Sequence, residues 1–483
     1  MLLDSILGML NMFLMHASVT RGEAVPPVPT NYFCGRYGHA ATKRGDGIFV
    51  YGGRRQGGVA NGTVTASDSG LVKLNLSSSW DVFTGGAQLT YVDSLHDVTK
   101  PPPLLIGGSI FHDSDDNGEF ILYGGGTANM SNTSTSPMSS FPVNQTMWSF
   151  SMDNSSWVTG PTEQQKGLEF APKHGAYVQS DEHGLAFYFN GLIQNATKEH
   201  PSLAMTVIDI QTQRTRRVST AAISSTEARI GPALQYIPEL GDKGGLVLIG
   251  GDTRQYGNEP NASNVDTMAP LDLIHVLDVG SLDAGDGIWY SQPTNGRVPD
   301  PRMDFCAITI PSPDQSGYHI YIVAGRSPAR AFDEVWVLSL PQFQWTQVYN
   351  GTHPNFGATC HLVGTKQLLL LGGDDQKARE KCEETKITLF DLTNLKWTPN
   401  YVKDGAEFRV PKAVYEWIGG TGMGQANMTE PEGGFSSEGL RNMFSGLALT
   451  SQKYGMTSCG TAMLGRFSLA TSLAVSIFSV LLL

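Results

Sequence analysis

The feature that most constrains the fold is a short apolar run that ends in two glycines and recurs along the chain. Four clear copies, IFVYGG, FILYGG, LVLIGG and LLLLGG, end at Gly52-Gly53, Gly124-Gly125, Gly250-Gly251 and Gly372-Gly373. Two degenerate copies, FYFNG and IYIVAG, lie between them and end at Asn190-Gly191 and Ala324-Gly325. Successive copies are 48 to 74 residues apart. Self-similarity at such a spacing indicates a solenoid, a propeller or another repeat array.

Each copy is followed by a variable stretch and a further apolar strand, and a turn rich in glycine or acidic residues precedes most copies. Five of the six units end in a tryptophan: Trp80, Trp157, Trp289, Trp345 and Trp397. Four antiparallel strands per unit cannot bury both of their faces alone, so we expect the units to pack around a common axis. Glycine permits a positive φ and close main-chain approach, and tryptophan supplies apolar area between neighbouring units.

These residues resemble the kelch repeat, and the resemblance covers about residues 32 to 420. In particular, FCGRYGHA (33–40) and VPKAVYEWIGG (410–420) resemble the first and last parts of secreted kelch proteins of filamentous fungi. The resemblance implies an all-β fold, a six-bladed kelch-type β-propeller similar to the central domain of galactose oxidase. For function it implies mainly binding and surface roles, with enzymes in the minority.

The repeat predicts blades at about 32–90, 104–160, 167–220, 226–293, 300–350 and 354–402. A closing segment follows at 406–420, where Ala413–Ile418 is predicted to be a strand that helps to close the ring, with an N-terminal strand as the alternative. Residues 421–457 are rich in Gly, Ser and Asn and predict a flexible stalk. Long insertions at Thr127–Gln145 and Thr253–Leu271 predict exposed loops on one face, which is often a binding face.

Both ends of the chain predict export. Residues 1–24 contain an apolar run followed by small residues, as in a signal peptide, and a buried helix is the alternative. Residues 458–483 end in an uncharged apolar tail with no basic residue after it. A membrane span that stops transfer is normally followed by Lys or Arg, so a GPI-attachment signal is favoured over a single C-terminal span.

Ten Asn-x-Ser/Thr sequons agree with a secretory route and predict a glycoprotein. They lie at Asn61, Asn75, Asn129, Asn132, Asn144, Asn154, Asn195, Asn261, Asn350 and Asn427. The expected location is the outer face of the plasma membrane or the cell wall.

Five cysteines are present, and removal of the tail after about residue 458 leaves four, which is consistent with two disulfides. We predict a disulfide between Cys360 and Cys382, which flank one glycine pair. The pairing of Cys34 with Cys306 is left open.

Basic residues recur at Arg36, Lys173, Arg229 and Arg302, near the start of the first strand of their blades. First strands line the central channel of a propeller, so these residues predict a basic ring at one channel mouth that binds an anion or an acidic glycan. The alternative is that each side chain hydrogen-bonds to carbonyls or acids of the surrounding blades.

Composition and motifs limit the chemistry. The net charge of −12 argues against nucleic-acid binding, which needs clustered Lys and Arg. The 11 histidines are scattered, and no nucleophile-elbow, zincin or P-loop motif occurs. We therefore predict no catalytic residue, no metal site and no cofactor.

Together these features predict a non-enzymatic, extracellular kelch propeller that binds protein or carbohydrate ligands at the cell surface and is held at the membrane by its C-terminal end. One alternative is an extracellular enzyme on a galactose-oxidase-like propeller. The other is a structural component of the cell wall.

Overall fold

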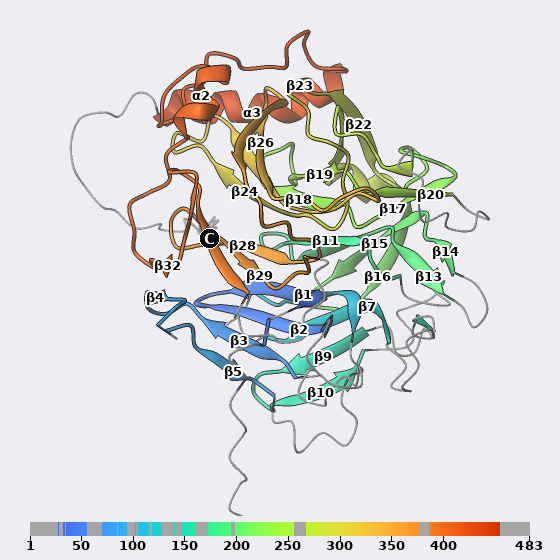
Figure 1. Ribbon diagram of the computed structural model, residues 1–483. Helices are drawn as coiled ribbons and strands as arrows, with labels where there is room; N and C mark the ends of the chain where they lie inside the picture. Colours follow the sequence, from blue (N-terminus) through green and yellow to red (C-terminus); the bar gives the residue numbers. More distant parts are fainter. Residues whose placement is uncertain are drawn as a thin grey trace, which may run out of the picture.

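The computed structural model describes residues 28, 32–33, 35–55, 70–84, 86–93, 102, 105–114, 118–127, 139–140, 147–160, 172–194, 199–255, 267–375 and 386–454. Within these ranges the chain forms six antiparallel sheets arranged around an axis (Figure 1). The predicted signal segment at 1–24 and the predicted anchor at 458–483 lie outside the described residues, as do Cys34, Cys382 and Cys459.

The first three blades are each built from one continuous stretch of chain. Blade one contains β1 (Arg36–Arg44), β2 (Gly47–Arg55), β3 (Val72–Asn75) and β5 (Leu89–Tyr91). Blade two contains β6 (Ile106–His112), β7 (Phe120–Thr127), β9 (Met147–Ser151) and β10 (Ser156–Thr159), and β8 (Ser139–Ser140) pairs with β7. Blade three contains β11 (Ala176–Ser180), β12 (Leu185–Phe189), β15 (Ala204–Asp209) and β16 (Thr215–Ser219).

The last three blades repeat this pattern. Blade four contains β18 (Ala233–Ile237), β19 (Gly245–Ile249), β21 (Leu273–Asp278) and β22 (Ile288–Pro293), with the 3₁₀ helix η5 (Gly280–Ala284) before β22. Blade five contains β24 (Cys306–Pro311), β25 (Tyr318–Val323), β26 (Glu334–Leu340) and β27 (Gln344–Asn350), and β23 (Asn295–Gly296) pairs with β27. Blade six contains β28 (Thr359–Val363), β29 (Gln367–Leu371), β30 (Ile387–Asp391) and β31 (Lys396–Thr398).

Three small pairs lie outside the six blades. The hairpin β13 (Leu192–Gln194) and β14 (Glu199–Pro201) extends from blade three, and β17 (Glu227–Ile230) pairs with β20 (Asp252–Gln255) beside blade four. The third pair joins β4 (Trp80–Asp81) to β32 (Asn400–Tyr401).

The glycine pairs form a closed ring of main-chain hydrogen bonds. In each blade the N–H of the second glycine donates to a carbonyl at or just before the start of the first strand of the next blade, at 2.6–3.2 Å. The six bonds run from Gly53 to Leu105, Gly125 to Pro172, Gly191 to Arg229, Gly251 to Arg302, Gly325 to Asn355 and Gly373 to Arg36. The last bond joins blade six to blade one, so the repeat that appears in the sequence also closes the ring.

The first glycine of each pair is required for a different reason. Its φ is positive, from +61° to +73° at the four clear copies. A Cβ on Gly372 would lie 2.5 Å from the carbonyl oxygen of Arg36, and one on Gly250 would lie 2.9 Å from that of Arg302. Asn190 and Ala324 replace this glycine in the degenerate copies and keep the left-handed conformation, at φ +51° and +61°.

A second series of main-chain bonds runs around the channel. Near the start of each first strand, one residue also has a positive φ, from +54° to +68°. Its N–H donates to the equivalent carbonyl of the preceding blade at 2.7–3.2 Å in five places: Gly38 to Gly357, His174 to Gly107, Gly231 to His174, Asp304 to Gly231 and Gly357 to Asp304. We call the face of the ring that carries these bonds and the glycine pairs the glycine face, and the opposite face, with the turns between first and second strands, the hairpin face.

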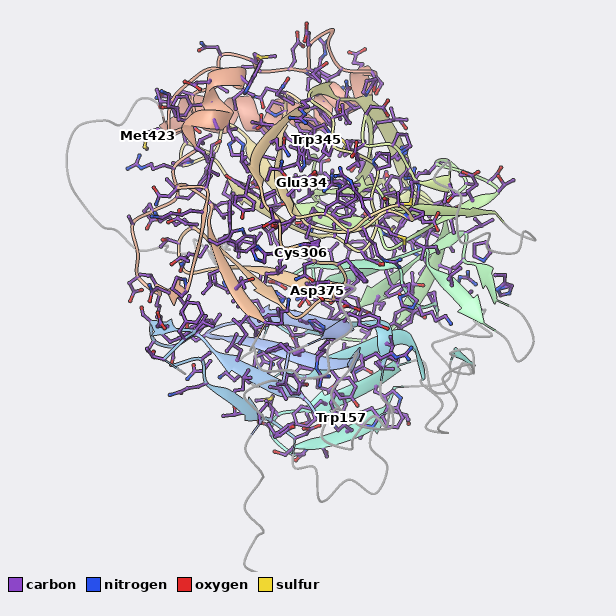
Figure 2. The ribbon with its side chains drawn as sticks, viewed as in Figure 1. Trp157, Cys306, Glu334, Trp345, Asp375 and Met423 are labelled. Carbon is purple, nitrogen blue, oxygen red and sulfur yellow. A yellow bond between two sulfur atoms is a disulfide. The ribbon has the colours of Figure 1, made fainter. Side chains whose placement is uncertain are left out.

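The predicted role of the tryptophans between blades is confirmed. Trp157 lies in blade two, near the edge of the molecule (Figure 2). Its ring centroid is 5.3 Å from that of Tyr51 in blade one, and its Nε1 donates to Asp93 at 3.0 Å. Trp289 of blade four lies 5.6 Å from Phe189 of blade three. Large aromatic surfaces therefore fill the wedge between neighbouring sheets, where they contribute most to burial.

The predicted closing strand at Ala413–Ile418 is wrong, because this segment forms the helix α2 (Lys412–Ile418), which packs on β26 and β27 of blade five. No strand is exchanged between the first and last blades in the part of the chain that the structure describes. The ring is instead closed by the main-chain hydrogen bond from Gly373 to Arg36 and by the β4–β32 pair. The Tyr401 hydroxyl also donates to the carbonyl of Leu76 at 3.2 Å. An ion pair between Lys403 and Asp46 at 2.9 Å lies beside this seam.

The predicted flexible stalk at 421–457 is also wrong for its described part. Residues 438–454 form the helix α3 (Glu438–Tyr454), and Leu440, Met443 and Phe444 are at most 4% exposed. These side chains join the core of blades four and five, and the N–H of Gly241 donates to the carbonyl of Met443 at 3.1 Å. Apolar residues at positions 440, 443, 444 and 447 have the spacing of one helix face, which outweighs the high content of Gly and Ser nearby.

The predicted Cys360–Cys382 disulfide is wrong, because Cys360 is bonded to Cys306, with their Cα atoms 5.7 Å apart. This bond joins the first strands of blades five and six. The first strands of neighbouring blades come close in space, so these two cysteines meet although 54 residues separate them in the sequence, and the spacing within one blade gave no indication of this.

Candidate functional site

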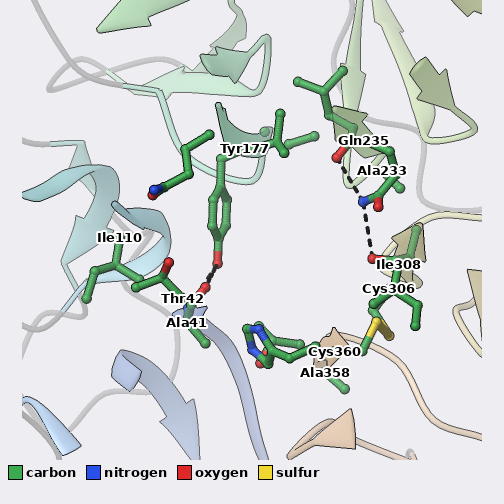
Figure 3. A pocket seen from close by; sticks show the side chains of 18 of the residues that line it. Ala41, Thr42, Ile110, Tyr177, Ala233, Gln235, Cys306, Ile308, Ala358 and Cys360 are labelled. Carbon is green, nitrogen blue, oxygen red and sulfur yellow. Dashed lines mark hydrogen bonds between the residues drawn. A yellow bond between two sulfur atoms is a disulfide. The ribbon is translucent and has the colours of Figure 1, made fainter. Parts of the chain in front are cut away.

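The six first strands enclose a central cavity of about 540 Å³. Its lining comes from β1, β6, β11, β18, β24 and β28 and from the residues just before them (Figure 3). Pockets of roughly 300–1,000 Å³ are the usual size for small-molecule sites in proteins. The end of the cavity that lies near the glycine face is lined by small residues, among them Gly108, Gly175, Ala233 and Ala358.

The predicted basic ring does not line this cavity. Arg36 is fully buried, and its Nη1 donates to the carbonyl of Gly52 at 2.6 Å. Arg229 and Arg302 make the equivalent bonds to Gly250 at 3.0 Å and to Ala324 at 3.1 Å. Lys173 is 3% exposed. The three guanidinium groups therefore have a structural role, and the prediction that they form an anion site at the channel mouth is wrong.

The physical reason lies in the bend that the glycine pair creates. A carbonyl buried at a bend must find a donor, and a buried guanidinium must find acceptors, so each satisfies the other. Arg302 also pairs with Glu334 at 2.6 Å, and the side chain of Arg302 is fully buried. Burial lowers the pKa of Arg229 to about 10, which leaves it charged at neutral pH.

The innermost strand of each blade turns one edge of its main chain toward the channel, and some of these edges are capped by side chains. The Tyr177 hydroxyl, from blade three, accepts from the N–H of Ala41 in blade one at 3.0 Å and donates to its carbonyl at 3.3 Å. Tyr177 thus reaches past blade two to an edge of blade one (Figure 3). Burial raises the pKa of Tyr177 to about 12, so the hydroxyl keeps its proton.

Two glutamines make related contacts. The Gln179 amide accepts from the N–H of His112 at 3.1 Å and donates to its carbonyl at 3.3 Å. The Gln235 amide donates to the carbonyl of Ala307 at 3.1 Å, and its oxygen accepts from the side-chain hydroxyl of Thr309 at 3.0 Å. Tyr177 and Gln179 therefore satisfy both the N–H and the carbonyl of a strand edge, whereas Gln235 satisfies a carbonyl alone.

The channel histidines are neutral contacts between blades. The His112 Nδ1 lies 2.9 Å from the Thr42 hydroxyl, and burial is the main cause that lowers the His112 pKa. Burial also lowers the pKa of His39 and of His361 to about 3. The charged side chains of the lining are Lys43, Asp181 and Asp304, and the last is paired with Arg326 at 2.7 Å. The wall of the cavity is therefore mostly uncharged.

The nearest resemblance to a catalytic arrangement is Thr42, His112 and Asp181. The His112 Nε2 lies 3.7 Å from Asp181, and the Gln179 amide lies 3.3 Å from the same nitrogen. The Thr42 side chain is 8% exposed, and its hydroxyl lies against the His112 ring. Within the described ranges, no three His, Cys, Asp or Glu side chains gather at distances suited to a metal ion.

Sequence reasoning missed Tyr177, Gln179 and Gln235 as the polar residues of the channel. They follow the left-handed residue of their own blade by three, five and four positions, counted from His174 and Gly231. Because side chains alternate along a strand, Tyr177 and Gln179 share one face of β11 whereas Gln235 lies on the opposite face of β18, so aligning the six first strands gives no single channel position. The basic residues lie before the left-handed residue, which is why they point into the blades.

The four sequons within the described residues are accessible. Asn154, Asn350 and Asn427 are exposed, and Asn75 is half-buried in β3. The other six, at Asn61, Asn129, Asn132, Asn144, Asn195 and Asn261, lie outside the described residues. In the part of the chain that the structure covers, no helix has both the length and the apolar character needed to cross a bilayer.

Comparison with known proteins agrees with this architecture. No family model matches the sequence. A kelch repeat-containing protein of Arthroderma benhamiae is 23% identical over 471 residues, which is 83% of this chain and 65% of that protein, so the chain spans about two thirds of the relative's length. The host cell factor of Drosophila melanogaster is 24% identical over 212 residues, covering 39% of this chain and 14% of its own.

Among solved structures, that of YjhT covers 77% of this chain and 99% of its own, with a TM-score of 0.48 and 12% identity. The repeat and the six sheets agree with the similarity to the fungal relative. The chain folds as a six-bladed β-propeller of the kelch type.

Proposed function

We propose that this protein is a non-enzymatic, extracellular binding module that presents its glycine face to protein or glycan partners at the cell surface. Kelch propellers as a class are protein-interaction modules, and the coarse assignment to that class follows from the fold and the relative. The location outside the cell, the glycan partner and the lack of catalysis are the proposed parts.

The observation that carries the proposal is the rigid origin of the connections between second and third strands. Each connection leaves the ring just after a glycine pair that is fixed by the closed set of six main-chain bonds. The insertions after Arg55, Thr127 and Gln255 therefore all begin on the glycine face. Loops on a rigid scaffold that share one face are the usual arrangement for a binding surface.

The C-terminal segment lies on the other side. The N–H of Asp314, in a turn of the hairpin face, donates to the carbonyl of Met423 at 3.1 Å, and Thr365 donates to Ala406 at 2.7 Å. Attachment to a membrane through the predicted anchor at 458–483 would leave the glycine face directed outward. The exposed sequons and the disulfide are chemically suited to an oxidising, secretory environment.

Export and anchoring are tested by expressing the full chain with both ends intact. We expect surface staining of intact cells, a loss of mass on treatment with a glycan-cleaving amidase, and release by phospholipase C. A cytosolic, unmodified product contradicts the extracellular part of the proposal. A surface protein that resists phospholipase C and retains Leu483 by mass spectrometry contradicts the GPI anchor alone.

The binding face is tested with two exposed alanines that the fold places on opposite sides. Ala329 lies between β25 and β26, on the glycine face, and Ala406 lies over the hairpin face. Labelled soluble propeller is added to the cells that produce the protein, and bound label is measured by flow cytometry. We expect Ala329→Glu to lower binding at least fivefold and Ala406→Glu to leave it unchanged. Equal effects of the two variants contradict a partner on the glycine face.

A further inference from the structure

The strand edges that face the channel are only partly satisfied by the protein. His112 faces the channel, and residues two apart on a strand turn their main-chain groups to the same side, so Ile110 faces it as well. Cys360 holds in β28 the position that Ala41 holds in β1, because each pairs with the residue two before the first glycine of its blade, Leu370 and Val50 respectively. In the part of the chain that the structure describes, no protein group hydrogen-bonds to these edges of Ile110 and Cys360.

A strand edge offers an N–H donor and a C=O acceptor side by side, so the group that satisfies it best is both donor and acceptor. The protein itself shows this at Ala41, where the Tyr177 hydroxyl accepts from the N–H and donates to the carbonyl. A ligand that carries several hydroxyls can repeat this contact at several edges of one channel.

The electrostatics favour a ligand without charge. His39 and His361 are held neutral by burial, and Tyr177 keeps its proton. Lys43 and Asp181 are the charged pair near the hairpin-face end of the lining, and they have opposite sign. An ionic ligand in the centre of the cavity would lose water without gaining a counter-charge.

We propose that the central channel binds a neutral, polyhydroxylated ligand of about the size of one or two sugar residues, held by the main-chain edges of β6 and β28. The cavity of about 540 Å³ has room for such a ligand. The small residues near the glycine face leave the entrance open at the side where the proposed binding surface lies. This inference rests on the proposed binding function and names the ligand class for one part of it.

The test is titration calorimetry of the soluble, glycosylated propeller with D-glucose, D-galactose and D-mannose, and with glucuronate and glucosamine as charged counterparts. We expect at least one neutral sugar to bind, and each charged counterpart to bind at least tenfold more weakly. No binding of any neutral sugar up to 50 mM (about 2 kcal/mol of standard binding free energy) overturns the proposal. Stronger binding of a charged counterpart overturns the assignment to neutral ligands.

The position of the ligand is tested by filling the channel from its two ends. Ala358→Phe adds volume near the glycine face and Leu362→Trp adds it near the hairpin face, and both residues line the cavity and are half-buried. We expect each variant to weaken sugar binding at least tenfold. If one of them does not fold, the other still tests the proposal. Phe83→Ala, on a side chain that is 86% exposed, is the control and leaves binding unchanged. Sugar binding that survives both filled channels places the ligand elsewhere and overturns the proposal.

Failure of this inference differs from failure of the proposed function. Cell binding that is lost in Ala329→Glu but unaffected by Ala358→Phe supports a partner on the glycine face and rejects the channel ligand. Sugar binding that is lost in Ala358→Phe, without any cell binding, supports the channel site alone.

Discussion

At the residue scale, the glycine pair meets two requirements, a left-handed backbone and the close approach of the next blade, that glycine satisfies with the least strain. The second glycine gives its N–H to the next blade, and the first leaves space for the carbonyl of that blade while its φ is positive. The buried arginines complete the same bend by donating to the carbonyl of the first residue of the pair. The sequence showed the glycines and the arginines as separate repeats, and only the structure joins them into one unit.

We therefore expect Gly372→Ala, at φ +69°, to destabilise the protein far more than an alanine at a glycine with a similar φ but open surroundings. Gly184 is that control, because its φ is +61° and no atom lies within 4 Å of an added Cβ. Gly184→Ala is expected to cost about 1–2 kcal/mol of unfolding free energy through backbone strain alone. Gly372→Ala adds the clash with the Arg36 carbonyl and is expected to cost at least about 3 kcal/mol in urea unfolding. Equal losses would show that the close approach has no energetic importance.

At the scale of the element, α3 shows how local composition misleads. The segment contains Gly and Ser and precedes an apolar tail, so it reads as a linker, yet four residues at helical spacing bury themselves against blades four and five. The side chain of Phe444 lies 5.5 Å from Phe343 and 5.4 Å from Phe435, measured between ring centroids. The helix thereby becomes part of the propeller core.

Phe444→Ala is expected to lower the unfolding free energy by about 3–5 kcal/mol, the usual cost of truncating a buried aromatic residue. Met423→Ala, at a side chain that is 41% exposed, is the control and should change it by less than about 0.5 kcal/mol. The measurement is urea unfolding followed by tryptophan fluorescence. An unfolding free energy that is unchanged in Phe444→Ala would show that α3 does not stabilise the propeller core.

The Cys306–Cys360 disulfide acts at the same scale, because it fixes the first strands of two neighbouring blades. It closes a loop of 54 residues, for which the chain-entropy model gives about 4 kcal/mol of stabilisation. We expect the double variant Cys306→Ala/Cys360→Ala to lose unfolding free energy of that order. Peptide mapping without reductant should recover the two cysteines in one linked pair, and a Cys360–Cys382 peptide would contradict the structure.

At the scale of the whole molecule, the repeat explains which features of the fold the sequence could predict. Six apolar runs at a regular spacing predict six sheets, and the tryptophans predict their packing, because both depend on residues within one blade. The disulfide partner, the channel-facing Tyr177 and the closure of the ring depend on which positions of neighbouring blades meet. The alignment of neighbouring blades is set by residues with a left-handed backbone conformation, such as His174 and Asp304. These two are not glycines, so the sequence does not mark them.

Buried neutral histidines also act on the molecule as a whole, because they are spread over blades one, four, five and six. Burial lowers the pKa of His275 and His319 to about 4, and that of His39 and His361 to about 3. The unfolded chain binds protons at these sites near pH 6.5, whereas the folded chain does not until about pH 3–4. Stability is therefore complete above about pH 6.5 and is lost as the pH falls from there toward 4, by about 1.4 kcal/mol per pH unit for each such histidine.

His319 is suited to test this dependence, because it is 1% exposed and lies between the hydroxyls of Ser312 and Ser339, each at 3.1 Å. We expect His319→Gln to be less stable than the parent at pH 7.5 but to lose less unfolding free energy between pH 6.5 and pH 5, by about 1–2 kcal/mol. Urea unfolding at four pH values measures both slopes. If His319→Gln and the parent have the same slope, His319 is already protonated in the folded protein or is neutral in both states, and the stabilisation of a buried neutral imidazole at this site is refuted.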